Sequence, residues 1–419
     1  MAGKWKSGTL CDLADVIMGQ SPSGETTNET GAGLPLLNGP TEFGSHYPQP
    51  VQFTTDPRKF AEPNDLLFCV RGSTGRMNWA DQRYAIGRGI AAIRPKHGSD
   101  LRHFVHAVVD ASLSSLLATA TGSTFPNVSR EQICGVVCLI PPLPEQKAIA
   151  DILGSLDDKI ELNRRTNETL EAMARAVFKS WFVDFDPVHA KSKGRQPDGM
   201  DAETASLFPG SFQNSEIGRV PKGWKVKTVS EVAEINGWTL GKNDGLDPIQ
   251  YIEISEVNRG EISNIQIFER GQEPSRARRR LRHGDTVLST VRPDRRSYFL
   301  CLHPSVNLIA STGFAVLSPT KVSWSFLHAG LTQSDVFDHL GQHADGGAYP
   351  AIRPELIGQW RLPLPDNAAI LDAFHGVCAR LFEKAENNRG QTDVLSQLRD
   401  SLLPRLLSGE VAVPVSKVA

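Results

Sequence analysis

The sequence predicts an α+β protein in which two strand-rich globular domains are separated by two long antiparallel helices that pair like a coiled coil. The first observation behind this prediction is an internal repeat, because the second half of the chain follows the pattern of the first and implies a pseudo-twofold. The second is a heptad pattern of apolar residues that closes each half. A length of 419 residues leaves room for two or three domains, and an apolar content of 40% suffices for real cores.

We expect six segments along the chain. They are a first globular domain at 1–144, a first long spacer helix at 145–185, a linker at 186–223, a second globular domain at 224–365, a second long spacer helix at 366–408 and a C-terminal tail at 409–419. The linker is rich in glycine, proline and charged residues, which is typical of connecting segments.

The two globular domains resemble each other in sequence. WKSGTLCDLADVI, from Trp5, aligns with WKVKTVSEVAEIN, from Trp224, and ATGSTFPNVSREQI (120–133) aligns with ADGGAYPAIRPELI (344–357). Both contain short β-branched and aromatic runs between glycines and prolines, such as NDLLFCV and GDTVLST, which indicate strands. One or two short helices are expected in each, around Leu101–Leu117 and Trp324–Leu340.

Each domain leads through a proline-rich connector, PPLP (141–144) or LPLP (362–365), into a long helical pattern. The first apolar stripe consists of Ile149, Ile152, Leu153, Leu156 and Ile160, and resumes at Leu170, Met173, Ala174, Val177 and Trp181. A shift of 225 residues gives the second stripe, which consists of Phe374, Val377, Cys378, Leu381 and Ala385, and resumes at Leu395, Leu398 and Leu402. A seven-residue repeat of this length indicates packing of helix on helix.

A polar layer interrupts each stripe at its centre. Its residues are Asn163, Thr166 and Asn167 in the first helix, and Asn388, Gln391 and Thr392 in the second. Antiparallel pairing would bring the two layers to one level, where buried amides can bond one another instead of facing leucine. Our hypothesis is that this layer fixes the register and orientation of the helices. The alternative is that Asn163 faces solvent or a partner subunit.

Several classes of site are absent from the sequence. There is no phosphate-binding GxxxxGK[ST] loop, no HExxH, no paired CxxC and no GxSxG motif. Cys134 and Cys138 in ICGVVC are expected to share one face of a strand as buried thiols, so no metal site is predicted. No stretch has the length and apolarity of a membrane span, and we expect a cytoplasmic protein. The sequence therefore favours a binding protein over an enzyme.

Four segments resemble the specificity subunit of type I restriction–modification enzymes. They are PPLPEQKAIADILGSLDDKIELNRRTNETLEAMARAVFKSWFVDFDPV (141–188), FPGSF (208–212), IGRVPKGW (217–224) and LRDSLLPRLLSGEV (398–411). The resemblance covers nearly the whole chain. It implies that the globular domains are target-recognition domains, each reading one half of a bipartite site on double-stranded DNA, and that the helices set the spacer between the halves.

The resemblance also implies partners and cofactors. Two modification (methyltransferase) subunits would bring S-adenosylmethionine, and restriction (translocase/nuclease) subunits would bring ATP and Mg²⁺, so that this non-catalytic chain binds no cofactor itself. Phe178, Trp181 and Phe182 are candidates for docking the partner subunits, and the alternative for them is packing within the chain. The alternative function is an assembly scaffold that binds partner subunits without reading DNA.

The candidate DNA-binding residues lie in glycine-rich and arginine-rich segments. The net charge of the chain is only −2, but RARRRLRHGDTVLSTVRPDRR (276–296) holds eight arginines against two aspartates. In the first domain the candidates are Arg71, Arg76, Asn78, Ser123 and Thr124. In the second they are Arg276, Arg278, Arg279 and Arg280 for phosphates, Arg292, Arg295 and Arg296 for bases, and Tyr349. For each single arginine, a solvated or ion-paired surface role is the alternative.

Overall fold

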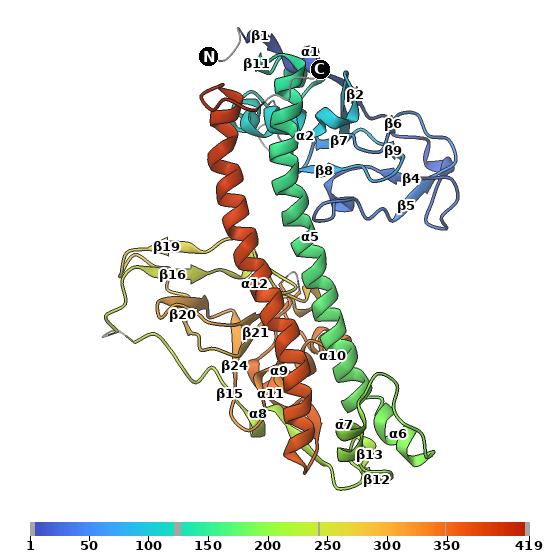
Figure 1. The fold of residues 1–419 in the computed structure, drawn as a ribbon, viewed down its shortest axis with the longest axis vertical. Coiled ribbons are helices and arrows are strands. Elements are labelled where there is room, and N and C mark those ends of the chain that lie inside the picture. Colours follow the sequence, from blue (N-terminus) through green and yellow to red (C-terminus); the bar gives the residue numbers. More distant parts are fainter. Residues whose placement is uncertain (1–4, 121–126, 242–243, 348, 415–419) are drawn as a thin grey trace. The chain divides into compact units, whose positions relative to one another are not determined.

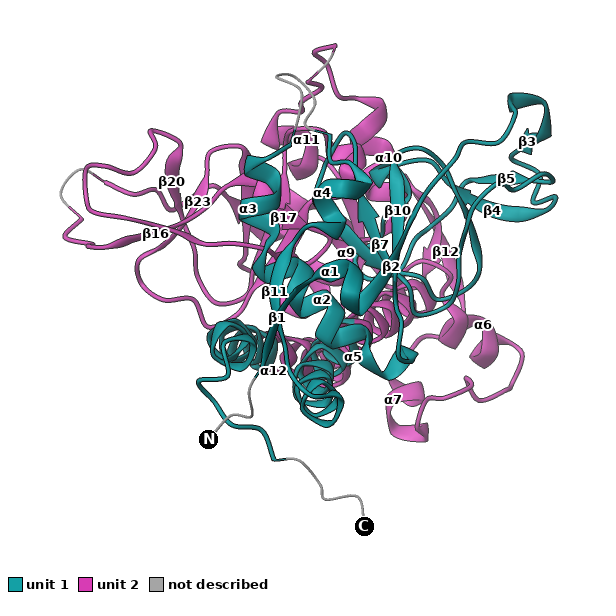
Figure 2. Cartoon of the chain, turned by 90° about the horizontal axis from the view of Figure 1, so that it is seen from above, with its two compact units in different colours: residues 1–164, 390–419 teal, residues 165–389 magenta. Residues whose placement is uncertain are grey.

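The structure is a computed structural model that describes residues 5–120, 127–241, 244–347 and 349–414. The chain forms two compact units, coloured separately in Figure 2. Unit 1 comprises Met1–Arg164 and Gly390–Ala419, and unit 2 comprises Arg165–Arg389. Each unit therefore contains one globular part together with one half of each long helix, whereas the sequence placed domain boundaries at the helix ends.

Unit 1 builds its globular part from two main sheets and a short ribbon (Figure 1). The strands are β1 (Lys6–Thr9), β2 (Ala14–Met18), β3 (Thr27–Asn28), β4 (Leu34–Leu37), β5 (Gln52–Thr54), β6 (Phe60–Ala61), β7 (Leu66–Cys69), β8 (Met77–Trp79), β9 (Tyr84–Ile86), β10 (Ile90–Pro95) and β11 (Val137–Ile140). The helices are α1 (Leu10–Leu13), α2 (Arg102–Ala111), α3 (Leu113–Ala118) and α4 (Arg130–Cys134), with 3-10 turns η1 (Gly24–Thr26), η2 (Pro40–Glu42) and η3 (Ser99–Leu101). The sheets have the orders β2-β10-β7-β8 and β3-β5-β4-β9-β6, and β1 pairs with β11.

Unit 2 contains the long helices' other halves and a second globular part. Its strands are β12 (Phe212–Ser215), β13 (Gly218–Pro221), β14 (Lys225–Thr228), β15 (Ala233–Ile235), β16 (Ile249–Ile252), β17 (Val257–Asn258), β18 (Glu261–Ile262), β19 (Gln266–Phe268), β20 (Ala277–Arg280), β21 (Asp285–Ser289), β22 (Tyr298–Cys301), β23 (Leu308–Ser311), β24 (Phe314–Pro319) and β25 (Arg361–Leu364). Its short helices are α6 (Asp186–Ser192), α7 (Ala202–Leu207), α8 (Val229–Val232), α9 (Trp324–Leu331), α10 (Ser334–Gln342) and α11 (Pro354–Gly358), with η4 (Ile254–Glu256) and η5 (Pro293–Arg295). The main sheets have the orders β15-β24-β21-β22 and β19-β16-β23-β20, and β14 pairs with β25.

The main strand orders of the two units correspond, apart from the additional edge strand β3 in unit 1, which confirms the internal repeat. In unit 1, β4 pairs antiparallel with β5 and parallel with β9, and β9 pairs antiparallel with β6. In unit 2, β16 pairs antiparallel with β19 and parallel with β23, and β23 pairs antiparallel with β20. The sheet β2-β10-β7-β8 of unit 1 corresponds to the sheet β15-β24-β21-β22 of unit 2. The ribbon β1–β11 corresponds to the ribbon β14–β25. The expected short helices are present as two consecutive helices in each unit, α2–α3 and α9–α10.

The long helices are α5 (Leu143–Phe182) and α12 (Ala368–Leu407), each of 40 residues. Within each unit their halves lie side by side and run in opposite directions (Figure 1). In unit 1, Asp157 faces Arg399 and Asn163 faces Thr392. In unit 2, Asn167 faces Asn388, and Trp181 packs on Phe374. As the residue number rises along α5 it falls along α12, so the predicted antiparallel pairing is confirmed within both units.

The aromatic residues at the end of α5 are buried in the core of unit 2. Phe178, Trp181 and Phe182 are 2%, 9% and 0% exposed. Phe182 packs against Phe326 of α9 and Phe374 of α12. The interpretation of these three side chains as an outer docking face is therefore corrected in favour of packing within the chain, because α9 and α12 cover them.

The segment expected to be a linker, 186–223, is folded onto the same core. It carries α6, α7 and the hairpin β12–β13, and it contributes the buried side chains of Val188, Phe208 and Val220. Phe208 packs on Trp181, so this segment covers the end of α5.

The expectation for the cysteines is partly wrong. Cys134 ends α4 and forms a disulfide with Cys11, whereas Cys138 lies in β11 and is a free thiol, so the two do not share a strand. Burial raises the pKa of Cys138 to about 11. Among the described residues, no helix combines the length and apolarity that crossing a membrane requires.

Candidate nucleic-acid interface

Two loops meet at the same place in each unit. In unit 1, the loop from β7 to β8 lies beside the segment that precedes α4, where the backbone N–H of Val128 donates to the carbonyl oxygen of Val70 at 3.2 Å. In unit 2, the loop from β21 to β22 lies beside the segment that precedes α11, where the N–H of Ile352 donates to the oxygen of Thr290 at 2.8 Å. Within each unit the fold therefore brings together two segments with candidate DNA-binding residues, and the described candidates among them are Arg71 and Arg76 in unit 1 and Arg292, Arg295, Arg296 and Tyr349 in unit 2.

A buried aspartate anchors the strand that carries the loop in each unit. Asp65 accepts a hydrogen bond from the N–H of Glu62 at 2.8 Å, and Asp285 accepts one from the N–H of Arg282 at 2.7 Å. Burial raises the pKa of Asp285. In unit 1, Arg94 of the neighbouring strand β10 adds a bidentate pair to Asp65, at 2.8 and 2.7 Å. These anchors fix the start of β7 and β21 and so the position of the loops that follow.

The candidates in unit 1 differ in exposure. Arg71 is exposed, and its Nε donates to Oδ1 of Asn127 at 3.3 Å, which joins the two loops. Arg76 is exposed and donates to the oxygen of Pro40 at 3.2 Å. Asn78 lies in β8, is 4% exposed and donates to the oxygen of Gly44 at 3.1 Å, which is a structural role. Ser123 and Thr124 lie outside the described residues.

The loop from β21 to β22 presents three arginines. The Arg292 guanidinium lies over the ring of Tyr349, 4.4 Å from its centroid, and Tyr349 is 70% exposed. Arg295 is exposed at the end of η5. Arg296 donates to Oδ1 of Asp338 in α10 at 3.1 Å, so this side chain ties the loop to its own unit.

The arginines of β20 form a separate group on the edge of the other sheet. Arg276 is exposed and Arg278 is half-buried. Burial lowers the pKa of Arg279, whose Nε has no hydrogen-bond partner in the described part of the chain. Arg280 lies 3.8 Å from the ring centroid of Trp238 and donates to Asp244 at 3.3 Å. Arg276 and Arg278 are thus accessible to solvent, and their contact with phosphates stays a prediction, whereas Arg279 and Arg280 are largely packed into the sheet.

The asparagines of the polar layer are buried and form hydrogen bonds between the helices. Asn388 Nδ2 donates to Asn167 Oδ1 at 2.9 Å in unit 2, and Asn163 Nδ2 donates to Thr392 Oγ1 at 3.4 Å in unit 1. The exposed fractions of Asn163, Asn167 and Asn388 are 2%, 7% and 3%. Thr166 is half-buried and Gln391 is exposed. The amides therefore join the helices, while the role of the layer in setting register stays a prediction.

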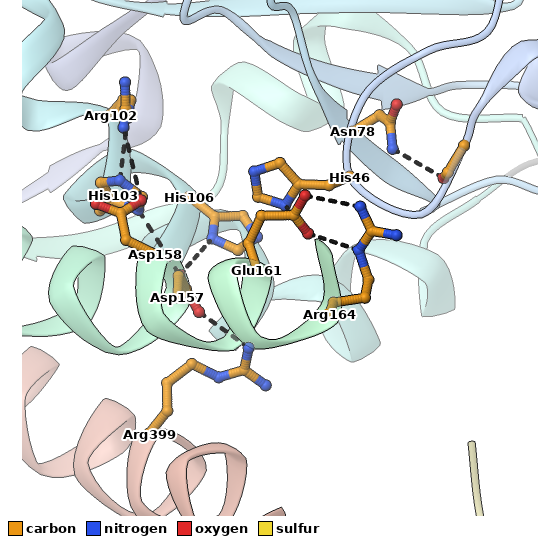
Figure 3. Close-up of polar contacts among 11 residues, drawn as sticks. His46, Asn78, Arg102, His103, His106, Asp157, Asp158, Glu161, Arg164 and Arg399 are labelled. Carbon is orange, nitrogen blue, oxygen red and sulfur yellow. Dashed lines mark hydrogen bonds and ion pairs between the residues drawn. The ribbon is translucent and has the colours of Figure 1, made fainter. Parts of the chain in front are cut away.

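Buried ion clusters fasten the globular part of unit 1 to its helices (Figure 3). Asp157 of α5 accepts a hydrogen bond from Arg399 of α12 at 3.0 Å, and its other oxygen lies 3.7 Å from His103 Nδ1 of α2. Burial raises the pKa of Asp157, but the interactions with His103 and Arg399 outweigh it and leave the pKa below its ordinary value. Arg102 Nε donates to His103 Nε2 at 3.0 Å, so the imidazole ring is held between Arg102 on one side and Asp157 on the other.

A second cluster of this kind lies in unit 2. Arg389 of α12 donates to Glu171 of α5 at 2.6 Å, and Arg175 donates to Glu171 at 3.4 Å and to the hydroxyl of Tyr298 in β22 at 3.2 Å. Sequence reasoning missed the partners that come from the other long helix or from the globular part, because they are up to 242 residues apart in the chain and no local pattern marks them. In the described part of the chain, no group of three or more His, Cys, Asp or Glu side chains could hold a metal ion.

Comparison with known proteins identifies relatives along the whole chain. Residues 2–172 match the family model described as the type I restriction modification DNA specificity domain. The type I restriction enzyme HindI specificity subunit of Haemophilus influenzae is 26% identical over 422 residues, which span 84% of this chain and 88% of that protein. The MjaIX specificity subunit of Methanocaldococcus jannaschii is 22% identical and spans 98% of this chain and 94% of its own.

The fold has a counterpart among solved structures. The crystal structure of the type I restriction-modification system S subunit from M. genitalium aligns over 96% of each chain, with a TM-score of 0.56 at 16% identity. That likeness supports the fold, and the sequence matches support the family. The chain, with its duplicated sheets and paired long helices, is similar in sequence and in fold to type I restriction–modification specificity subunits.

Proposed function

We propose that this chain is the non-catalytic DNA sequence-recognition subunit of a type I restriction–modification complex. Each unit would read one half of a bipartite target through the loops that follow its equivalent strands, β7 in unit 1 and β21 in unit 2. One observation carries the proposal: the same loop pair occurs on the same framework twice, but with different side chains. A duplicated framework with divergent loops suits two readers of different base sequences.

The chemistry of the loops supports contact with DNA. Arg71 of unit 1 and Arg295 of unit 2 are exposed, and in unit 2 the Arg292 guanidinium also lies over the ring of Tyr349. Arginine is the side chain that most often contacts guanine edges and that also binds phosphates bidentately. Arg276 and Arg278 would add phosphate contacts, which position a protein on the duplex without reading sequence.

The long helices would set the spacer between the two half-sites. A helix of 40 residues spans about 60 Å at roughly 1.5 Å per residue, which exceeds the ~34 Å of one DNA turn. The amide pair Asn167–Asn388 supports a fixed register, because a shift by one turn would bury these groups against apolar side chains.

The proposal includes partners that carry the chemistry. Two modification subunits would supply the methyltransferase site and its S-adenosylmethionine, and restriction subunits would supply ATP- and Mg²⁺-dependent translocation and cleavage. The complex would act on DNA in the cytoplasm. This chain would contribute recognition and assembly only.

The test is co-expression of this chain with its methyltransferase partner in a host that lacks both, followed by mapping of methylated bases in the host genome. The proposal predicts methylation at a split site only when both chains are present. A complex that assembles without methylation would point to a scaffold, and modification or cleavage by this chain alone would point to an enzyme. Either result would contradict the proposal.

A further inference from the structure

A disulfide joins two short helices of unit 1. Cys11 in α1 and Cys134 at the end of α4 are 123 residues apart in the sequence, and their Cα atoms lie 4.7 Å apart. Both residues are half-buried, so the bond is not enclosed in the core and a small thiol can approach it. Disulfides are uncommon in proteins that act inside the cell, and those that occur there often respond to the redox state.

Unit 2 shows that the framework itself brings these two positions together. The internal repeat aligns Cys11 with Ser230 and Cys134 with Gly358. Ser230 Oγ donates to the carbonyl oxygen of Gly358 at 3.0 Å, and a Cβ atom on Gly358 would lie 3.5 Å from the Cβ of Ser230. Disulfides span Cβ separations of about 3.5–4.5 Å. The fold therefore holds such a pair at bonding distance without any sulfur, so the bond in unit 1 can open and close while the helices stay in place.

The disulfide ends the helix that follows one of the two candidate DNA-binding segments of unit 1. In that segment the Val128 N–H donates to the oxygen of Val70 in the loop from β7 to β8, at 3.2 Å. Asn127 accepts a hydrogen bond from Arg71 of the same loop, at 3.3 Å. α4 then begins at Arg130, which donates to a backbone oxygen of β2 at 3.1 Å. Because α1 leads directly into β2, the disulfide adds a covalent link between the sheet and the helix that positions this segment.

The four other cysteines are less suited to the same chemistry. Cys69, Cys301 and Cys378 are buried, and Cys138 is half-buried. Burial raises the pKa of all four thiols, to about 11 for Cys138 and to about 12 for Cys378. The thiolate is the form that attacks a disulfide, so these four thiols should exchange slowly. The six cysteines therefore offer one exchangeable pair.

We propose that Cys11 and Cys134 form a reversible redox modification site that tunes how unit 1 holds its half of the target. The reaction is thiol–disulfide exchange with a low-molecular-weight disulfide such as oxidised glutathione. One S–S bond forms in the protein, the S–S bond of the reagent breaks, and the two thiol protons leave on two molecules of reduced thiol, whose excess reverses the reaction. Oxidation preorganises the segment before α4 and so lowers the ordering cost of binding. This inference rests on the proposed function and adds a regulation of one unit only, since Ser230 and Gly358 form no such bond.

The first test measures the redox state of the pair in the complex with the methyltransferase partner. The complex is equilibrated in buffers with different ratios of reduced to oxidised glutathione and quenched with acid. Free thiols are then alkylated after unfolding, and mass spectrometry reports each cysteine. Alkylation of Cys11 and Cys134 should fall together as the buffer becomes more oxidising, whereas the other four cysteines should be alkylated throughout. A pair that stays fully oxidised or fully reduced in every buffer would overturn the inference.

The second test compares DNA binding by the oxidised and the reduced wild-type complex, which requires no variant. The Kd for a duplex that carries the methylated motif should be about threefold lower for the oxidised complex, the gain expected from ordering one long side chain such as Arg71 in advance. Cys11→Ser combined with Cys134→Gly gives unit 1 the pair found in unit 2, and its Kd should be the same in both buffers. Cys138→Ser is the matched control, because Cys138 is a free thiol in β11 of the same unit, and this variant should keep the wild-type response.

Two further outcomes would overturn the inference. One is an oxidised wild-type complex that binds no more tightly than the reduced complex. The other is a redox response that persists when Cys11→Ser and Cys134→Gly are combined, because the response would then arise elsewhere. In both cases the complex still binds its split site, so the proposed function survives while the redox assignment fails. If the wild-type complex binds no split site in either redox state, the proposed function itself fails.

Discussion

Replacing Asn388 with leucine should destabilise unit 2 by a predictable amount. Asn388 is 3% exposed and donates to Asn167 Oδ1 at 2.9 Å. Leucine has a similar volume but no donor, so the buried amide of Asn167 would lose this bond without gaining water. Leaving a buried polar group unsatisfied costs about 1–3 kcal/mol, so we expect a loss of about 2 kcal/mol. For a unit of this size, that corresponds to a fall in Tm of about 4–8 °C.

Thermal and urea unfolding of Asn388→Leu, Asn167→Leu and the double variant measure this effect. The double variant removes both polar groups and should be more stable than either single variant, because no buried amide is then left without a partner. Asn387→Leu is the matched control, since Asn387 is the neighbouring residue in α12 and is exposed. Its stability should lie within about 0.5 kcal/mol of wild type.

The reasoning would be refuted by two results. One is an Asn388→Leu variant as stable as the Asn387→Leu control, which would mean that the amide pair makes no net contribution. The other is a double variant whose loss equals the sum of the two single losses, because additivity would show that the two asparagines do not interact.

Three further predictions concern the pH dependence of stability, an ion cluster and DNA binding. Burial lowers the pKa of His328 to about 3. Below pH 6.5 the imidazole is therefore protonated in the unfolded chain but stays neutral in the folded chain. The free energy of unfolding should fall as the pH drops from 6.5 toward 3, by roughly 2 kcal/mol at pH 5. In urea unfolding at several pH values, His328→Phe should lose this contribution to the pH dependence of stability. Asp157→Asn breaks the buried pair with Arg399 and should cost about 3 kcal/mol in urea unfolding, whereas the exposed neighbour Asp158→Asn should cost little. Arg278→Ala should weaken binding of the complex to all DNA sequences and reduce the slope of log affinity against log salt by about one, and an unchanged slope would remove Arg278 from the phosphate contacts.

The long helices were predictable because their signal is local. The heptad stripe and its repeat after 225 residues predict two long helices that pack on each other. The observed bounds, Leu143–Phe182 and Ala368–Leu407, agree closely with the expected ones. The internal repeat also predicted that the two globular parts would share a framework. The pairing of strands within that framework was not predictable, since parallel pairs such as β4–β9 join segments about fifty residues apart.

The roles of individual arginines depend on distant partners. Arg278 and Arg280 look alike in the sequence, but Arg280 meets Trp238 and Asp244 and is held in the sheet. In the same way, the sequence alone indicates an exposed aromatic side chain at Phe182. In the structure Phe326, from a helix about 140 residues later in the chain, packs against it. Composition identified where a basic surface could lie, and tertiary contacts decided which side chains remain on it.

The left-handed backbone at Arg292 restricts how this position can change during evolution. Glycine, asparagine and aspartate adopt such a conformation with little strain, whereas β-branched side chains do not. The main chain at this position therefore tolerates small polar residues better than β-branched ones, so the sequence of this loop can vary without remodelling the strands that carry it.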